Sequence, residues 1–172
     1  MPYDWSTKIR EMEDGSKLPF DVKFRIRGPG IIPCPQTDGV VEAHRFVAAA
    51  VSPVFQALLS KNWSGGQAEN HEIGIQQTCP GAFETLITFI YNTDSMNFHS
   101  VKDVGKLIEL YHVSDQYEIL ECKKKLFERC SSLELDSTNY GQILSLLGKL
   151  KISNTKLFLK IILQICSQSM KK

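Results

Sequence analysis

The stretch AHRFVAAAVSPVF, residues 43–55, decides how this chain folds. Residues 44–51 are rich in alanine and predict a short helix. Ser52 and Pro53 then end that helix and start another, because serine suits the N-cap position and proline the first helical turn. Apolar residues recur at helical spacing up to Leu59 and predict one buried face. The stretch therefore predicts two consecutive helices that turn back on each other.

Strand patterns lie on both sides of these helices. Residues 20–27, FDVKFRIR, alternate apolar and polar side chains, which is typical of a half-buried strand. A proline-rich loop up to Asp38 separates them from a short second strand over residues 39–43, so the two strands form a hairpin with an expanded connection. After a polar loop, residues 71–75 alternate again and predict a third strand with Ile73 and Ile75 inward.

Only helices follow the third strand. Amphipathic patterns predict them over residues 80–91, 100–111, 119–130, 140–147 and 158–165. We expect Ser100 to be the N-cap of the second of these, with Asp103 in its first turn. The order of elements predicts an α+β fold, in which a small, mainly three-stranded sheet is covered by helices and followed by a C-terminal helical pair.

Residues 1–19 contain a narrow apolar stripe. Trp5, Ile9 and Met12 fall on one face of a short helix that is not stable alone. Such a stripe must be covered, either by the chain's own domain or by a partner. The pattern leaves both possibilities open.

Composition limits the classes of function. The chain has 172 residues, with 20 Lys and Arg against 19 Asp and Glu, and so lacks the strong positive charge of a nucleic-acid binder. Its most apolar stretch, residues 157–166, is far shorter than the roughly 20 residues that span a membrane. We expect neither nucleic acid nor membrane as a partner. Five cysteines without a secretory signal indicate reduced thiols and a cytoplasmic or nuclear location.

No catalytic, metal or cofactor motif emerges from the residues. Cys122 and Cys130 are eight residues apart, too far to hold one zinc ion locally, and the histidines have no metal-site spacing. His44 is expected to hydrogen-bond the backbone locally, and residues 123–125, three lysines, to form a solvated helix face. We expect no enzyme and no cofactor, with a small cysteine-dependent enzyme as the distant alternative.

Residues 21–26, DVKFRI, and the stretch 43–55 strongly resemble the BTB/POZ domain. Two further segments are similar to motifs of the same family: Phe83 followed by residues 89–91, FIY, and residues 113–117, VSDQY. The last two helices resemble, in layout and apolar spacing, the start of the BACK or 3-box extension. The resemblance divides the chain into an N-terminal segment (1–19), a BTB/POZ domain (20–130) and a BACK-like extension (131–172).

The resemblance implies a protein-interaction module that forms homodimers. Its other candidate partners are further BTB proteins and cullin-3, for which many family members act as ubiquitin-ligase adaptors. The implied dimer interface comprises the apolar stripe and a charged pair, namely Trp5, Ile9, Met12, Asp21 and Arg45. The implied cullin-binding surface comprises Leu59, Trp63 and Tyr91.

The chain departs from the family pattern in three places. The hairpin loop over residues 28–38 is longer than usual. No glutamate follows Trp63 at the spacing of the apolar-x-Glu signature that cullin-3 binders often carry. No kelch, MATH, zinc-finger or channel segment is present to select a substrate. A stand-alone oligomerisation module without a ligase role is therefore the alternative to a cullin-3 adaptor.

Overall fold

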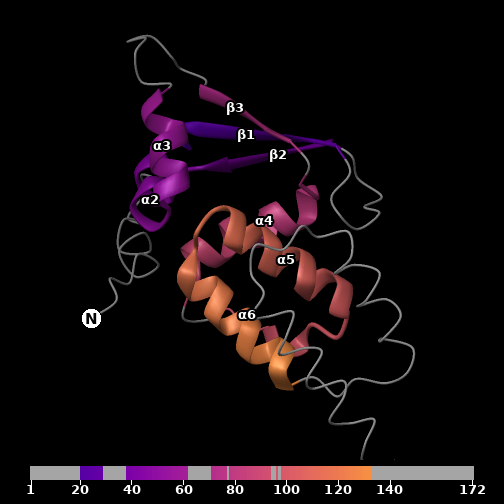
Figure 1. Ribbon diagram of the computed structural model, residues 1–172. Helices are drawn as coiled ribbons and strands as arrows, with labels where there is room; N and C mark the ends of the chain where they lie inside the picture. Colours follow the sequence, from indigo (N-terminus) through magenta and orange to yellow (C-terminus); the bar gives the residue numbers. More distant parts are fainter. Residues whose placement is uncertain are drawn as a thin grey trace, which may run out of the picture.

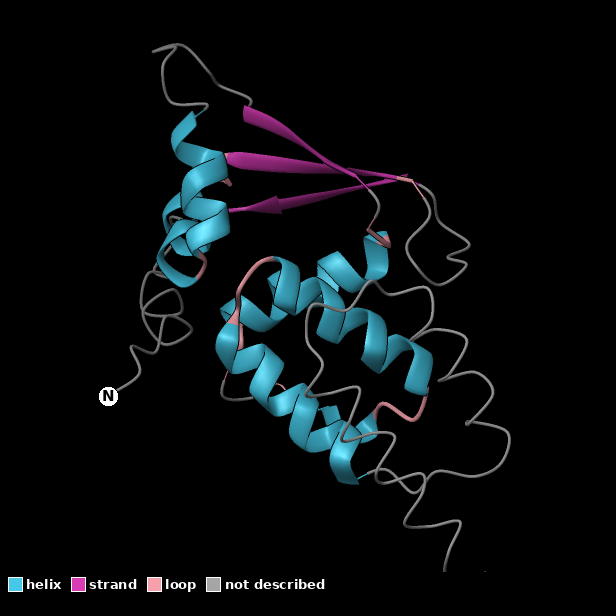
Figure 2. Cartoon of the chain, viewed as in Figure 1, coloured by secondary structure: helices cyan, strands magenta, loops and turns pink. Residues whose placement is uncertain are grey.

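A computed structural model of the chain describes residues 20–28, 38–61, 71–76, 78–93, 96 and 98–132. Figures 1 and 2 show a small sheet with helices packed against one end and beneath it. The apolar stripe of residues 1–19, Trp63 and the predicted helices over 140–147 and 158–165 lie outside the described residues and stay predictions.

Three strands form the sheet, in the order β2-β1-β3. Strand β1 (Val22–Arg27) pairs antiparallel with β2 (Asp38–Ala43) and parallel with β3 (His71–Gln76). This confirms the predicted hairpin and third strand. Gly28 ends β1 with a φ of 100°, a left-handed conformation that glycine adopts without steric cost.

The parallel pair β1–β3 needs a long crossover, because parallel strands cannot be joined by a tight turn. Helices α2 (Arg45–Val51) and α3 (Pro53–Lys61) lie within it and pack together at one end of the sheet (Figure 1). Beneath the sheet lie α4 (Pro80–Tyr91), α5 (Val104–Gln116) and α6 (Leu120–Ser132), with the short 3-10 helix η1 (Phe98–Ser100) between α4 and α5. The arrangement confirms the predicted α+β class.

A cluster of four buried rings joins the sheet to the helices. Phe24 of β1 lies 5.3 Å, centroid to centroid, from both Phe55 of α3 and Phe83 of α4. Tyr117, at the end of α5, stacks on Phe55 at 4.6 Å and meets Phe83 edge-on at 5.4 Å. All four side chains are at most 3% exposed. The cluster is therefore the part of the core in which elements distant in sequence meet.

Ser52 ties the α2–α3 turn to this cluster. Its hydroxyl accepts a hydrogen bond from the N–H of Phe55 (3.0 Å) and donates one to the carbonyl of Tyr117 (2.6 Å). The first bond confirms the predicted N-cap. The second connects residues 65 positions apart and leaves this buried hydroxyl satisfied as both donor and acceptor.

The predicted cap of α5 is wrong by three residues. Ser100 belongs to η1, and the helix begins only at Val104, so Asp103 is the N-cap. One oxygen of its carboxylate accepts hydrogen bonds from the N–H groups of Gly105 (2.9 Å) and Lys106 (3.2 Å). A carboxylate satisfies these free donors and also interacts favourably with the positive end of the helix dipole.

We therefore expect Asp103→Ala to lower the free energy of unfolding by about 1 kcal/mol, whereas Ser100→Ala changes it by less than about 0.5 kcal/mol. Urea unfolding followed by circular dichroism measures both variants. An equal or larger loss for Ser100→Ala would contradict the cap assignment.

The lysine run on α6 is not simply a solvated face. Lys123 forms an ion pair with Asp115, and its ammonium lies 5.7 Å from the ring centroid of Tyr111. Lys125 donates to the carbonyl of Thr93 and lies over the ring of Phe89. The long apolar stems of lysine let the charged ends reach across to neighbouring elements. Only Lys124 in this run is exposed as predicted.

Candidate protein-interaction surface

Asp21 and Arg45 meet where β1 begins and α2 starts, but not as a side-chain ion pair. The Asp21 carboxylate accepts a hydrogen bond from the backbone N–H of Arg45 (2.7 Å), and the Asp21 N–H donates to the carbonyl of Ala43 (3.2 Å). His44, the N-cap residue of α2, makes no capping bond with its own side chain. Asp21 therefore caps α2 from the position just before β1, at the end of the helix where negative charge is stabilising.

The side chain of Arg45 reaches in the other direction, toward α3. Its Nη2 donates to the carbonyl of Leu59 at 3.3 Å. Residues Asp21 and Arg45, predicted as a pair, are thus brought together, and they fix β1, α2 and α3 relative to one another. Their contact runs through the backbone N–H of Arg45, and their predicted place in a dimer interface stays a prediction.

His44 is held by the far end of α4. The hydroxyl of Tyr91 accepts a hydrogen bond from the His44 N–H (2.7 Å) and lies 3.0 Å from Nδ1 of the imidazole. The expectation of a local backbone bond for His44 omitted this partner 47 residues away. Burial raises the pKa of the Tyr91 hydroxyl above its ordinary value, so the group stays uncharged and can donate its proton to Nδ1.

Two aromatic rings flank His44 on the outside of the molecule. The ring centroid of Phe20 lies 4.9 Å from that of His44, and the centroid of Phe46 lies at 6.1 Å. His44 itself is buried, yet Phe20 is 52% exposed and Phe46 is 49% exposed. We call Phe20, His44 and Phe46 the aromatic surface. Large exposed aromatic side chains beside a rigid support are typical of protein-binding sites.

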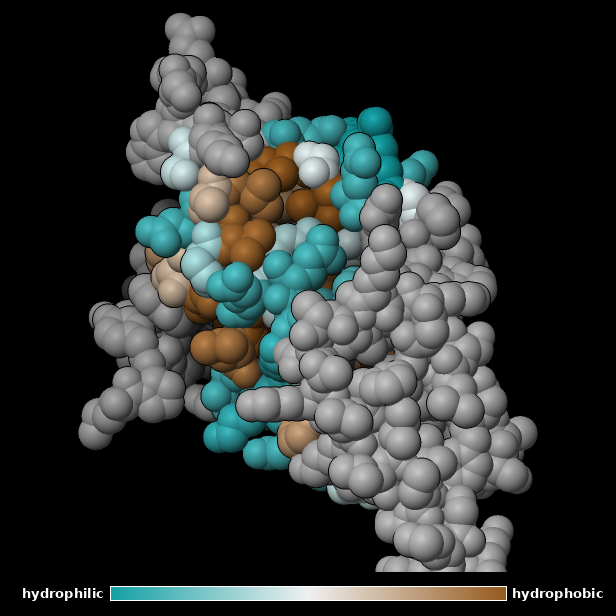
Figure 3. Space-filling model, viewed as in Figure 1, coloured by the Kyte–Doolittle hydropathy of each residue, from teal (hydrophilic) through white to brown (hydrophobic). Residues whose placement is uncertain are grey.

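The predicted site residues omitted Phe20 and Phe46. In α2 the buried residues are Val47 and Ala48, so the phenylalanine at position 46 points away from the core. Phe20 precedes β1, whereas the alternating pattern predicts it as part of the strand. Figure 3 shows apolar side chains gathered beside α2 and α3 on the visible face, with hydrophilic side chains around them.

Of the three predicted cullin-binding residues, the structure describes Leu59 and Tyr91. Leu59 is only 4% exposed and belongs to the core, so its side chain offers little surface to a partner. Tyr91 is partly exposed, but its hydroxyl is directed to His44. Trp63 and the stripe residues Trp5, Ile9 and Met12 lie outside the described residues.

The described part of the chain contains no group of three or more His, Cys, Asp or Glu side chains placed to hold a metal ion. Cys122 and Cys130 are free and buried, and burial raises their thiol pKa values to about 12 and about 11. A thiol that stays protonated is a poor nucleophile. Cys79, in contrast, is disulfide-bonded, so the expectation of five reduced thiols is wrong at this position.

None of the described helices is long and apolar enough to cross a membrane.

Burial of two tyrosine hydroxyls and two cysteine thiols predicts that the folded chain loses stability at alkaline pH. The pKa values of Tyr111 and Tyr117 are raised from 10.0 to about 12, and those of Cys122 and Cys130 from 9.0 to about 12 and 11. Because the folded pKa exceeds the unfolded one, this stabilisation is fully present below about pH 9 and is lost as the pH rises toward about 12.

The urea midpoint should therefore fall as the pH is raised above 9, the ordinary pKa of a thiol. Cys122→Ala removes one of these groups and should make the decline shallower. A midpoint that stays constant from pH 9 to pH 11, the folded pKa of Cys130, would contradict the buried state of these side chains.

The chain matches known proteins over part of its length. A family model described as the BTB/POZ domain matches residues 34–132, which is more than half of the chain. Among solved structures the chain is similar to the BTB domain of zebrafish PATZ1, at 17% identity and a TM-score of 0.49, with 72% of this chain and 85% of that chain covered. No curated protein matches the chain. The residues matched by the family model include β2, β3 and helices α2 to α6.

Proposed function

Because the chain belongs to the BTB/POZ family, whose domains mediate protein–protein interaction and commonly form homodimers, we propose that it self-associates through the aromatic surface. The observation that carries the proposal is the exposure of Phe20 and Phe46, each about half accessible beside the buried His44. Burial of such rings against a partner removes apolar surface from water and stabilises a complex.

Hydrogen bonds within the chain position the residues around the aromatic surface. Asp21 fixes the start of α2, Arg45 fixes α2 to α3, and Tyr91 holds His44 between the two exposed rings. A surface already ordered in the free protein loses less conformational entropy on binding. These hydrogen bonds are thus suited to present the two phenylalanines, and Asp21 and Arg45 act as positioning residues.

The two rings alone are too small to hold a stable dimer. A buried phenylalanine covers about 150–250 Å², whereas a stable interface buries about 800 Å² on each partner. The stripe formed by Trp5, Ile9 and Met12 supplies three more large apolar side chains, and Phe20 follows that segment directly in sequence. In a two-fold dimer each copy's stripe would cover the aromatic surface of the other.

Self-association is tested by mixing two differently tagged copies of the full chain and purifying one tag. We expect the second tag to be recovered at micromolar concentration. A variant in which Ile9 and Met12 are both replaced by Lys should lose this recovery while its circular dichroism spectrum stays unchanged. Recovery by this variant at the level of the unmodified chain would remove the stripe from the interface.

A role as cullin-3 adaptor is the narrower form of the proposal. Two observations weigh against tight docking: Leu59 is buried, and no glutamate stands two residues after Trp63, where Gly65 is found. A carboxylate there forms a charge-assisted hydrogen bond, for which roughly 1.5–3 kcal/mol is typical. We therefore favour a stand-alone oligomerisation module without a ligase role over a cullin-3 adaptor.

Gly65→Glu restores the apolar-x-Glu pattern and is expected to raise cullin-3 binding about tenfold or more over the unmodified chain. Gly66→Glu adds the same charge one residue later and serves as the matched control. A pull-down with purified cullin-3 across a concentration series measures both. Tight binding of the unmodified chain, lost in Trp63→Ala, would instead support the adaptor role.

A further inference from the structure

The solvent-facing side of the sheet carries a row of three cations. Lys23, Arg25 and Arg27 alternate with buried residues along the central strand β1, so all three point away from the helices. Acidic residues of the neighbouring strands lie opposite them in the register: Glu42 and Asp38 on β2, and Glu72 on β3. Cross-strand pairs of opposite charge are expected to stabilise such a face.

Two of the three cations pair with these acids, Lys23 directly across the register and Arg25 diagonally. Lys23 forms an ion pair with Glu42 at 3.0 Å, and Arg25 binds both carboxylate oxygens of Glu72, with the Nη2–Oε2 bond at 2.8 Å. Arg27 differs. Asp38 is its direct partner in the register, yet within the described residues neither side chain makes a hydrogen bond or an ion pair.

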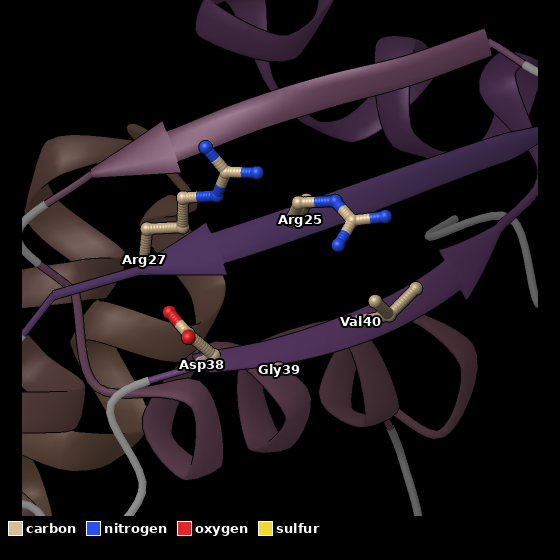
Figure 4. Close-up of a pocket in the computed structure, with 5 residues that line it drawn as sticks. All are labelled: Arg25, Arg27, Asp38, Gly39 and Val40. Atoms are coloured by element: carbon tan, nitrogen blue, oxygen red, sulfur yellow. The ribbon is translucent and has the colours of Figure 1, made fainter.

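A hollow of about 360 Å³ lies between these side chains, lined by Arg25, Arg27, Asp38, Gly39 and Val40. Figure 4 shows both arginines and Val40 on the same face of the sheet, with Asp38 directed toward the strand that carries Arg27. Val40 is 53% exposed, so its apolar side chain is accessible to a ligand on this face.

The backbone beneath the hollow cannot easily shift. Gly39 faces the opposite side of β2, where an added Cβ would lie 2.8 Å from the Cβ of Pro80. Strand β2 therefore lies directly against the start of α4, and only glycine permits that approach. On β3 the register partner of Arg25 is Gly74, which has no side chain, and the contact from this strand to the guanidinium comes from Glu72.

The side chains that line the hollow favour a ligand with a carboxylate group. A guanidinium presents N–H donors in a planar fork that matches a carboxylate, and Arg27 has all of its donors available within the described residues. Glu72 orients Arg25 beside it through Nε and Nη2. Val40 offers an apolar contact and Asp38 an acceptor for an N–H group. Because Asp38 and Glu72 balance the two arginines, a doubly charged phosphate is favoured less than a singly charged carboxylate.

We propose that this hollow binds an acidic peptide segment of a partner protein, with a carboxylate side chain on Arg27 and Arg25, a backbone N–H on Asp38 and a neighbouring apolar side chain on Val40. The site is separate from the aromatic surface. Phe20 precedes β1 and Arg27 ends it, which places them about 20 Å apart along an extended strand. A self-associated molecule can therefore bind the peptide at the same time.

The test uses the full chain and NMR signals of the arginine Nε–H groups and of the Val40 methyl groups. The probe is the blocked tripeptide acetyl-Val-Glu-Val-amide, with acetyl-Val-Gln-Val-amide as the neutral match and inorganic phosphate as a third ligand. We expect saturable shifts of the Arg27 and Val40 signals with the Glu peptide at millimolar concentration, and binding of the Gln peptide about fivefold weaker.

Arg27→Gln should weaken binding of the Glu peptide about fivefold. Lys23→Gln removes a cation from the same strand and face but outside the hollow, and should leave binding unchanged. The proposal is overturned if the Glu peptide causes no saturable shift, if Lys23→Gln weakens binding as much as Arg27→Gln, or if phosphate binds more tightly than the Glu peptide. Self-association is measured separately for each variant. Because the aromatic surface contains neither Arg27 nor Lys23, both variants should still self-associate, and a failure of peptide binding leaves the proposed function untouched.

Discussion

Replacing Phe83 with alanine is expected to lower the free energy of unfolding by about 3–5 kcal/mol. The ring is fully buried and contacts Phe24, Phe55 and Tyr117, which belong to three other parts of the fold. Its removal leaves a cavity where the sheet, α3 and α5 meet. Because a domain of this size is stable by only about 5–15 kcal/mol, the variant should lose a large share of its stability.

Urea unfolding at a fixed protein concentration measures this loss, since association would otherwise shift the midpoint. Leu120→Ala is the control, because Leu120 is 73% exposed and its truncation should cost less than about 0.5 kcal/mol. A loss below about 1.5 kcal/mol for Phe83→Ala would mean that the four rings do not form the centre of the core.

The double variant Phe20→Glu and Phe46→Glu should abolish self-association at micromolar concentration. In a two-fold interface both residues occur twice, so four half-exposed rings lose their apolar contact and four carboxylates are introduced. Lost burial of roughly 1–2 kcal/mol for each ring corresponds to a dissociation constant at least about a thousandfold higher.

Light scattering coupled to size-exclusion chromatography measures the mass of the variant. Leu120→Glu places a charge on a more exposed apolar residue outside the aromatic surface and should keep the mass of the unmodified chain. If both variants dissociate, general surface charge and not the aromatic surface is responsible. If neither does, the interface lies elsewhere.

The sequence predicts the elements well where one side of an element is buried. Alternation along β1 follows from its buried residues Val22, Phe24 and Ile26, and the structure confirms it. Ser52 was identifiable as a cap because its bond to Phe55 is local. Both features depend only on residues within one element or next to it. The spacing of apolar and polar residues in the sequence predicts such local features.

Interactions between distant elements were not predictable in the same way. Asp21 caps α2 from 24 residues away, and Tyr91 binds His44 across 47 residues. Asp103 and Ser100 both suit an N-cap, and only the position of η1 decides between them. The exposure of Phe20 and Phe46 likewise depends on what packs around them, so spacing alone could not assign them to a surface.

Sedimentation velocity of the unmodified full chain across micromolar concentrations tests the proposed self-association most directly. We expect one species with twice the 19.4 kDa mass of the chain. A single species of 19.4 kDa at every concentration would contradict a self-associating interaction module.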